Sequence, residues 1–218
     1  MRRPDHRGAR ELPGGVGKRA RRKCGEGMSL RVIAGSARGR RLKSVPGDTT
    51  RPVMDRVKEA LFNILAGDVI DSNWWDLFGG TGAIGIEALS RGAAFVRFTD
   101  LNRAPVETIR ENVEYCGFSK LAEVRKGDAF SMLSAQPGRK FEFIYIAPPQ
   151  YHEMWSRALS LVDENIGWLS ETGTVIVQID PLEYKEVALE NLEETEQRKY
   201  GSTLLLFYDQ IQQPPPAK

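Results

Sequence analysis

The chain has 218 residues, of which 41% are hydrophobic and 28% are charged, and its net charge is +2. This length suits one main domain with a sizeable core, and the composition excludes a wholly disordered chain. The two cysteines, Cys24 and Cys116, exclude a disulfide framework and a C-x-x-C metal pair, and Cys116 is expected to be buried on a helix. No apolar run reaches the roughly 20 residues that span a bilayer, and residues 1–27 lack the apolar core of a secretory signal, so we expect a cytoplasmic protein.

The two ends of the chain are predicted to be disordered. Residues 1–27 hold nine Lys or Arg and three Asp or Glu, which gives this leader a charge of +6 and leaves −4 for the remainder. The leader is either a segment ahead of the native start or a basic tail that attracts RNA. Residues 211–218, with three consecutive prolines, form the other disordered end.

Residues 28–72 are predicted to form a small basic cap. A short strand is expected over 30–34, followed by a basic, turn-rich stretch and then by a helix with apolar side chains at helical spacing from Val57 to Leu65 and Pro52 near its start. Basic side chains of this kind contact RNA phosphates and supply affinity without sequence information, whereas the alternative is a solvated basic loop. Lys58 belongs to the same basic run. The candidate RNA-binding residues are Arg38, Arg40, Arg41, Lys43, Arg51 and Arg56.

Short apolar runs alternate with amphipathic helices over residues 73–210. Strands are predicted at 74–78, 95–99, 122–126, 141–146, 175–179 and 204–208. One helix over 102–116 buries Val106, Ile109, Val113 and Cys116, and another buries Trp155, Ala158, Leu159 and Val162. Strands that alternate with helices predict an α/β fold, doubly wound and Rossmann-like, whose mostly parallel sheet is covered on both faces.

The glycine-rich stretch between the first of these strands and the following helix carries the strongest chemical signal. Glycines at 79, 80, 82 and 85 let the backbone turn tightly and approach a ligand closely. Asp100 lies 18 residues beyond Gly82, at the end of the next strand, where its carboxylate can accept hydrogen bonds from two ribose hydroxyls. The pattern predicts a nucleoside-binding crevice, although Asp100 could instead cap the helix that begins near Asn102.

The spacing Gly80-x-Gly82-x-x-Gly85 also fits a dinucleotide site, so an NAD(P)-dependent oxidoreductase is the rival interpretation. Asp76 would repel a pyrophosphate but suits the cationic amino-acid end of S-adenosylmethionine. Asp128 ends the third strand and suits a hydrogen bond to an adenine amino group, or it caps the next helix. These acids favour S-adenosylmethionine. The candidate cofactor-binding residues are Asp76, Phe78, Gly79, Gly80, Thr81, Gly82, Asp100, Leu101, Asp128 and Ala129.

The fourth strand runs directly into Ala147-Pro148-Pro149-Gln150-Tyr151. The order of the glycine loop, the acids and this Pro-Pro turn resembles that of amino-group methyltransferases. The N-terminal block, made of residues 31–35, 38–40, 51–52 and 55–63, narrows the resemblance to the bacterial RsmD family of 16S ribosomal RNA (guanine-N2) methyltransferases. The resemblance covers roughly residues 30–208. Its N-terminal block is the most family-specific part, because many methyltransferases share the glycine loop.

The resemblance implies a methyltransferase fold, S-adenosylmethionine as methyl donor with S-adenosylhomocysteine as product, and ribosomal RNA or the small ribosomal subunit as partner. A monomer without metal or membrane contact is expected. The candidate catalytic residues are Ala147, Pro148, Pro149 and Tyr151. Tyr151 would stack on an extruded base, or else pack beside the turn. His152 is expected to be a surface residue.

Ala147 departs from the family, in which Asp or Asn precedes the two prolines and helps to hold the target amino group. Alanine offers no side-chain acceptor, and losing one positioned contact costs on the order of 2–4 kcal/mol of transition-state stabilisation. Three interpretations follow. The carbonyl of Ala147 or Pro148, with Gln150, positions the amine; the substrate atom is a different one; or the chain is an RNA-binding or ribosome assembly factor that keeps the cofactor site without efficient chemistry.

Overall fold

The computed structural model describes residues 30–46, 55–150 and 153–212. The predicted leader and residues 213–218 of the predicted C-terminal tail, together with Arg51, Pro52, Tyr151 and His152, lie outside these ranges. The helices are α1 (Asp55–Leu65), α2 (Ala83–Ser90), α3 (Arg103–Tyr115), α4 (Ala129–Leu133) and α5 (Met154–Glu164), with 3-10 helices η1 (Ala66–Val69), η2 (Ile166–Trp168) and η3 (Pro181–Glu183). The strands are β1 (Asn73–Asp76), β2 (Phe95–Asp100), β3 (Ala122–Lys126), β4 (Phe141–Ile146), β5 (Leu169–Ile179), β6 (Leu192–Tyr200) and β7 (Thr203–Gln210).

The strands form one sheet in the order β3-β2-β1-β4-β5-β7-β6. Strands β1 to β5 pair in parallel, whereas β7 is antiparallel to both of its neighbours, β5 and β6. The carboxyl ends of β1 to β5 therefore meet at one side of the sheet, which we call the carboxyl edge. The chain reverses its direction of winding between β1 and β4, the kind of switch point at which α/β proteins bind ligands. The predicted mostly parallel, doubly wound sheet is confirmed.

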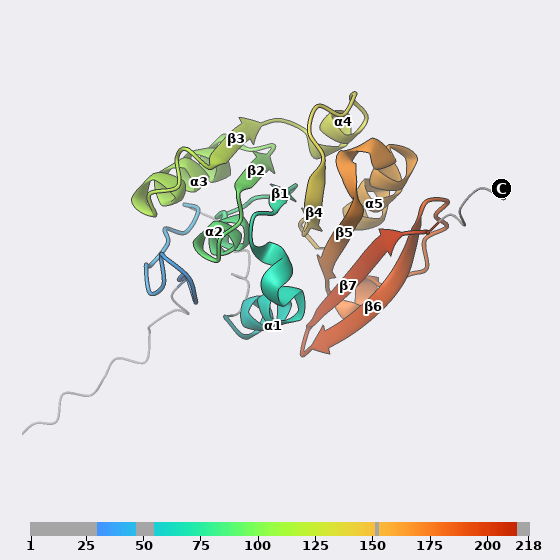
Figure 1. Ribbon diagram of the computed structural model, residues 1–218, viewed down its shortest axis with the longest axis horizontal. Coiled ribbons are helices and arrows are strands. Elements are labelled where there is room, and N and C mark those ends of the chain that lie inside the picture. Colours follow the sequence, from blue (N-terminus) through green and yellow to red (C-terminus); the bar gives the residue numbers. More distant parts are fainter. Residues whose placement is uncertain (1–29, 47–54, 151–152, 213–218) are drawn as a thin grey trace, which may run out of the picture.

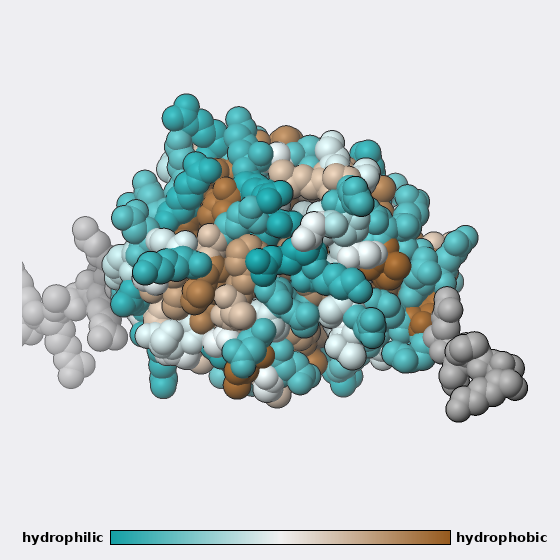
Figure 2. Space-filling view, turned by 45° about the horizontal axis from the view of Figure 1, so that its top comes forward, coloured by the Kyte–Doolittle hydropathy of each residue, from teal (hydrophilic) through white to brown (hydrophobic). Residues whose placement is uncertain are grey.

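Two apolar layers lie on the two faces of the sheet, because successive side chains of each strand alternate between these faces. Trp74 of β1 packs with residues of α1, α2 and α3, whereas its neighbour Trp75 packs with residues of α4 and α5. Successive side chains of a strand point to opposite faces, so a short apolar strand serves both layers. Figure 1 shows α1, α2 and α3 grouped apart from α4 and α5. Figure 2 shows hydrophilic residues over most of one face of the molecule, with smaller apolar areas between them.

The N-terminal segment, residues 30–46, differs from the prediction. The strand expected over 30–34 is wrong, because only an isolated antiparallel bridge joins Arg31 to Arg41. The backbone amides of Ile33 and Ala34 donate to the carboxylate of Glu87 on α2, at 2.8 and 2.9 Å, instead of to a neighbouring strand. Buried residues of the segment belong to the same apolar cluster as Trp74 and α2. The N-terminal segment thus shares the core of the sheet domain.

The far side of the sheet also differs from the prediction. Strand β6 was not predicted, because its residues are mostly charged and exposed and Leu192 is its one buried side chain. Strand β5 begins at Leu169, six residues before the predicted start. Strand β1 ends at Asp76, so Phe78 lies in the loop that follows. Within the described ranges, no helix is long and apolar enough to cross a membrane.

Candidate functional site

The glycine loop, residues 78–82, connects β1 to α2 at the carboxyl edge. Gly80 and Gly82 have φ angles of +53° and +77°, which L side chains rarely adopt. A Cβ atom on Gly79 would lie 2.7 Å from Cδ1 of Ile109 on α3. The loop backbone therefore lies closely against its neighbours, and the N–H groups of Gly79 and Gly82 donate to the carbonyls of Thr99 and Gly79. A close approach of a ligand to this loop stays a prediction.

Asp76 is the innermost acid of the site, with 2% of its surface exposed at the end of β1. Burial raises the pKa of its carboxyl to about 7; a hydrogen bond from the backbone of Gly85 opposes this shift, and the charge of Asp100 adds to it. Gly85 itself lies where a Cβ atom would be 2.3 Å from the ring of Phe98, so α2 packs directly on β2. A buried carboxylate with this pKa gains stability when a cation lies beside it.

Asp100 links the glycine loop to the start of α3. Its Oδ2 accepts from the backbone N–H of Gly80 at 3.1 Å and its Oδ1 accepts from the N–H of Asn102 at 2.9 Å. Asn102 is the N-cap of α3, so the alternative that Asp100 caps this helix is wrong. A carboxylate oxygen can accept more than one hydrogen bond, so these bonds do not exclude a ligand at Asp100. Leu101 beside it has 61% of its surface exposed.

Asp128 is half-buried and begins α4. Its Oδ2 accepts from the backbone N–H of Ser131 at 3.0 Å and from the Ser131 hydroxyl at 2.7 Å, and the bond from this hydroxyl is the main cause of its lowered pKa. The helix-cap interpretation is therefore confirmed, and a role toward adenine stays a prediction. Ala129 is buried next to it.

The Pro-Pro turn lies on the other side of β1 from these acids. It follows β4, which pairs in parallel with β1, so Ala147 leaves the sheet at the same edge as Asp76. Ala147 and Pro148 are half-buried, whereas Pro149 and Gln150 are exposed. The sheet thus brings the cofactor candidates and the described catalytic candidates together at the switch point.

The basic residues of the N-terminal segment lie apart from this site. Arg38, Arg40, Arg41 and Lys43 of this segment are all exposed, as is Arg56 on α1. Arg40 donates to the carbonyl of Tyr115 and its guanidinium lies 5.6 Å from the centre of that ring, at the C-terminal end of α3. Helix α3 begins at the carboxyl edge and has 13 residues. Arg40 is therefore about 18 Å from that edge, at 1.5 Å per residue, a distance that an RNA strand can span.

Lys58 differs from the other described residues of the basic run, because it is buried. Its side chain is 1% exposed and its Nζ lies 3.1 Å from Glu87 of α2, which is completely buried. Glu87 also pairs with Arg91 at 2.9 Å and accepts from the N-terminal segment. Lys58 thus docks α1 on α2 and cannot reach RNA. The one acid within the apolar sequence of α2 is the signal that could have indicated this pair.

Asn112 is a second residue that the sequence analysis missed. It is buried on α3, where its Nδ2 donates to the carbonyls of Thr81 and Lys43, both at 3.0 Å, and its Oδ1 accepts from the Lys43 N–H at 2.8 Å. One amide therefore ties the glycine loop to the N-terminal segment. Among the described residues, no group of three or more His, Cys, Asp or Glu side chains is placed to hold a metal.

Comparisons with known proteins agree with this geometry. The family model described as Conserved hypothetical protein 95 matches residues 30–209. The chain is 34% identical over 149 residues to ribosomal RNA small subunit methyltransferase D of Escherichia coli. The matched region covers 68% of this chain and 74% of that relative. It is 35% identical over 181 residues to the putative rRNA methyltransferase YlbH of Bacillus subtilis. This match covers 82% of this chain and 98% of YlbH. The solved structure of Escherichia coli yhhF has a TM-score of 0.74 and 31% identity over 84% of this chain and 98% of that one.

Proposed function

Because the chain belongs to the RsmD family of ribosomal RNA small subunit methyltransferases, we propose that it transfers a methyl group from S-adenosylmethionine to the exocyclic amino group of a guanine in small-subunit ribosomal RNA. The observation that carries this proposal is the gathering of Asp76, the glycine loop and Asp100 beside the Pro-Pro turn at one edge of the sheet. A buried acid at the base of the glycine loop suits a cationic ligand and disfavours a pyrophosphate.

The candidate cofactor-binding residues contact different parts of the methyl donor. S-adenosylmethionine, when bound, supplies a methyl group that its sulfonium already activates. Asp76 pairs with the cationic amino group, and the glycine loop admits the amino-acid end at close range. Asp100 accepts from the ribose hydroxyls while it holds Gly80, and Asp128 with Ala129 borders the adenine.

The residues of the Pro-Pro turn position the acceptor. A guanine amino group is a poor nucleophile because its lone pair is delocalised into the ring, so its hydrogen bonds must direct it toward the methyl carbon. The carbonyls of Ala147 and Pro148 accept these hydrogen bonds, assisted by the side-chain amide of Gln150. Tyr151 stacks on the extruded base. Orientation supplies most of the rate, so we expect neither a strong base nor a metal.

The basic N-terminal segment holds the RNA. Its exposed arginines contact phosphates away from the reacting guanine, and they set the register without reading sequence. The partner is ribosomal RNA or the small subunit, and the enzyme acts as a cytoplasmic monomer. We propose residues 73–210 as the catalytic domain and residues 28–72 as the RNA-facing addition to it.

A second function is favoured by one observation, the absence of a side-chain acceptor at Ala147. A ribosome assembly factor that binds RNA and the cofactor with little transfer would keep every feature of the cofactor residues. It would lack only the acceptor that holds the amine. The two functions differ in one measurable respect, which is the transfer of the methyl group.

The test is transfer of a labelled methyl group. The protein is incubated with labelled S-adenosylmethionine and either small-subunit ribosomal RNA or assembled small subunits that lack the modification, and the labelled nucleotide is then mapped. We expect a single labelled guanine, with the label on its exocyclic nitrogen. Binding of RNA without any label would favour the assembly factor. A label on another atom would contradict the proposed acceptor and retain the donor.

A further inference from the structure

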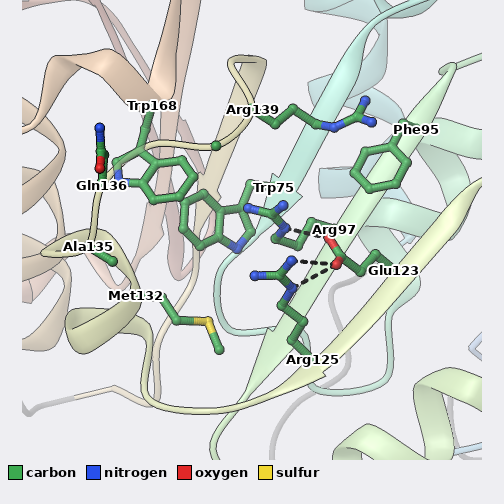
Figure 3. Close-up of a pocket in the computed structure, with 11 residues that line it drawn as sticks. Trp75, Phe95, Arg97, Glu123, Arg125, Met132, Ala135, Gln136, Arg139 and Trp168 are labelled. Atoms are coloured by element: carbon green, nitrogen blue, oxygen red, sulfur yellow. Dashed lines mark hydrogen bonds and ion pairs between the residues drawn. The ribbon is translucent and has the colours of Figure 1, made fainter.

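A cavity lies on the sheet face that α4 and α5 cover. Its volume is about 530 Å³, within the range of roughly 300–1,000 Å³ that small-molecule sites occupy. Its lining includes Trp75, Arg97, Glu123, Arg125, Arg139 and Trp168, a set different from the cofactor candidates. Figure 3 shows the guanidinium groups of Arg97 and Arg125 side by side near Trp75, with Glu123 between their outer ends. We call this cavity the arginine pocket.

Arg97 forms the inner wall of the arginine pocket. Its side chain is 7% exposed, and its Nε donates to Glu123 at 2.7 Å. Its guanidinium lies 5.2 Å from the ring centre of Trp75 and 5.8 Å from that of Trp168. Burial lowers its pKa, Glu123 opposes the shift, and the charges of Arg125 and Arg139 add to it. Arg125 and Arg139 are therefore both close enough to Arg97 to repel its positive charge.

Arg125 and Arg139 form the outer wall and are both exposed. Arg125 donates twice to one oxygen of Glu123, at 2.8 and 2.6 Å. Arg139 lies 4.1 Å over the ring of Phe95 and donates to Oδ1 of Asn73 at 2.9 Å. Asn73 in turn donates to Glu142, which lies behind it. The lining residues thus hold three guanidinium groups and one carboxylate, so two positive charges are not balanced within the lining.

We propose that the arginine pocket binds a phosphate group. Planar guanidinium groups match phosphate oxygens in pairs, and arginine is the residue most often used for that purpose. The aromatic side chains around Arg97 hold it in place and exclude water from one side, which strengthens its attraction for an anion. Glu123 is shared by Arg97 and Arg125, so a phosphate competes with a single carboxylate for both.

Two sources could supply this phosphate, the backbone of the RNA or a free nucleotide. The RNA source rests on the proposed function. The position of the pocket favours it, because β3 is an edge strand of the sheet and carries Arg125 and Lys126 exposed along it. An RNA strand that follows this edge would pass beside Asp128 at the start of α4.

The test uses two charge-removing substitutions, Arg125→Ala with Arg139→Ala. The probes are a fluorescent fragment of small-subunit ribosomal RNA and adenosine monophosphate. We expect RNA affinity to fall about tenfold. The slope of log affinity against log salt concentration should also decrease in magnitude by about 1.5, because each of the two lost phosphate contacts contributes roughly 0.7–0.9 to it. The matched control is Arg198→Ala on β6, an exposed arginine paired with Glu196 at the opposite edge of the sheet, which should change neither.

A third substitution should act in the opposite direction. Glu123→Gln keeps an oxygen for the buried Arg97 but removes the negative charge that repels phosphate, so affinity should rise about threefold. A purely structural role for these residues would lower affinity in both variants. Melting temperature and S-adenosylhomocysteine binding, measured on the same samples, separate loss of folding from loss of the pocket.

The two probes distinguish the sources. Loss of RNA affinity supports an RNA phosphate, and loss of adenosine monophosphate binding with unchanged RNA affinity supports a free nucleotide in the same pocket. If the double variant binds both probes as tightly as Arg198→Ala does, the proposal that the arginine pocket binds phosphate is overturned. The proposed function fails separately, if the unaltered protein binds RNA and the donor but transfers no methyl group.

Discussion

The two sides of the switch point are fixed by different kinds of interaction. On the cofactor side, Asp100 holds the amides of Gly80 and Asn102, and Asn112 holds the carbonyl of Thr81. On the acceptor side, Ala147 contributes no polar side-chain atom, and the half-buried Pro148 and exposed Pro149 follow directly. The candidate donor residues are therefore fixed by side-chain hydrogen bonds, whereas the proposed acceptor contacts are backbone carbonyls. Substitutions should be costly on the first side and tolerated, or even favourable, on the second.

The largest effect is expected for Asp76→Asn. Removing the buried charge should weaken S-adenosylhomocysteine binding about 100-fold at pH 8, because a charge-assisted hydrogen bond is worth about 1.5–3 kcal/mol. The same substitution should stabilise the free protein. The pKa of Asp76 is about 7 when folded and about 3.9 when unfolded, so stability falls as pH rises from about 4 to 7 and stays low above.

Calorimetry and thermal unfolding measure both consequences of Asp76→Asn. We expect the variant to gain at most about 4 kcal/mol of unfolding free energy at pH 8 and almost nothing at pH 4, because a pKa difference of one between the folded and unfolded states is worth about 1.4 kcal/mol. Unchanged affinity in a folded variant would show that Asp76 does not face the cofactor.

The next largest effect concerns the basic N-terminal segment. Arg40→Glu with Arg41→Glu should weaken RNA binding about 20-fold, because each substitution removes an attraction and adds a repulsion. Both arginines are exposed and Arg40 lies at the far end of α3, so donor affinity should change less than twofold. Equal RNA affinity in the double variant would remove this segment from the RNA interface.

A tenfold effect is expected from pH alone. Below pH 7 a proton occupies Asp76 in the free protein and must leave before the cationic amino group can pair with it. Donor affinity should therefore be about tenfold weaker at pH 6 than at pH 8. The Asp76→Asn variant serves as the control and should show a flat profile. A sloping profile in that variant would assign the titration to another group.

The smallest effect is expected on the acceptor side. Ala147→Asn introduces a side-chain acceptor before the two prolines, and it should raise kcat about fivefold with little change in donor affinity. The gain should stay below the full value of a positioned contact, because the proposed function already assigns the amine to the carbonyls of this turn. A fall in kcat would indicate that the pocket of this chain is shaped for alanine.

Sequence patterns predicted the parts of the fold that rest on local regularity. Strands β3 and β4 have the predicted bounds, because apolar side chains and turn residues mark them. Strand β6 was missed because an edge strand needs few buried side chains, and its backbone pairing with β7 leaves no hydrophobic pattern. The N-terminal strand was wrong because Glu87, more than 50 residues away, takes the amides of Ile33 and Ala34.

In the candidate site too, features marked by a local sequence pattern could be predicted, whereas contacts between distant residues could not. Glycines and strand-terminal acids could be found because parallel strands place their carboxyl ends together. The pair formed by Lys58 and Glu87, the bridge made by Asn112 and the arginine pocket join residues from distant parts of the chain. Such partners have no fixed spacing in the sequence. Arg97, a charge among the apolar residues of β2, was the one visible sign of the arginine pocket.

Binding of the donor tests the central claim most directly, because the rival nucleotide can be compared on the same protein. Isothermal titration at pH 8 with S-adenosylhomocysteine and with NADH separates a methyltransferase from an oxidoreductase. We predict one micromolar site for S-adenosylhomocysteine, lost in Asp76→Asn, and no measurable heat for NADH. Tight binding of NADH with none of S-adenosylhomocysteine would contradict the methyltransferase assignment.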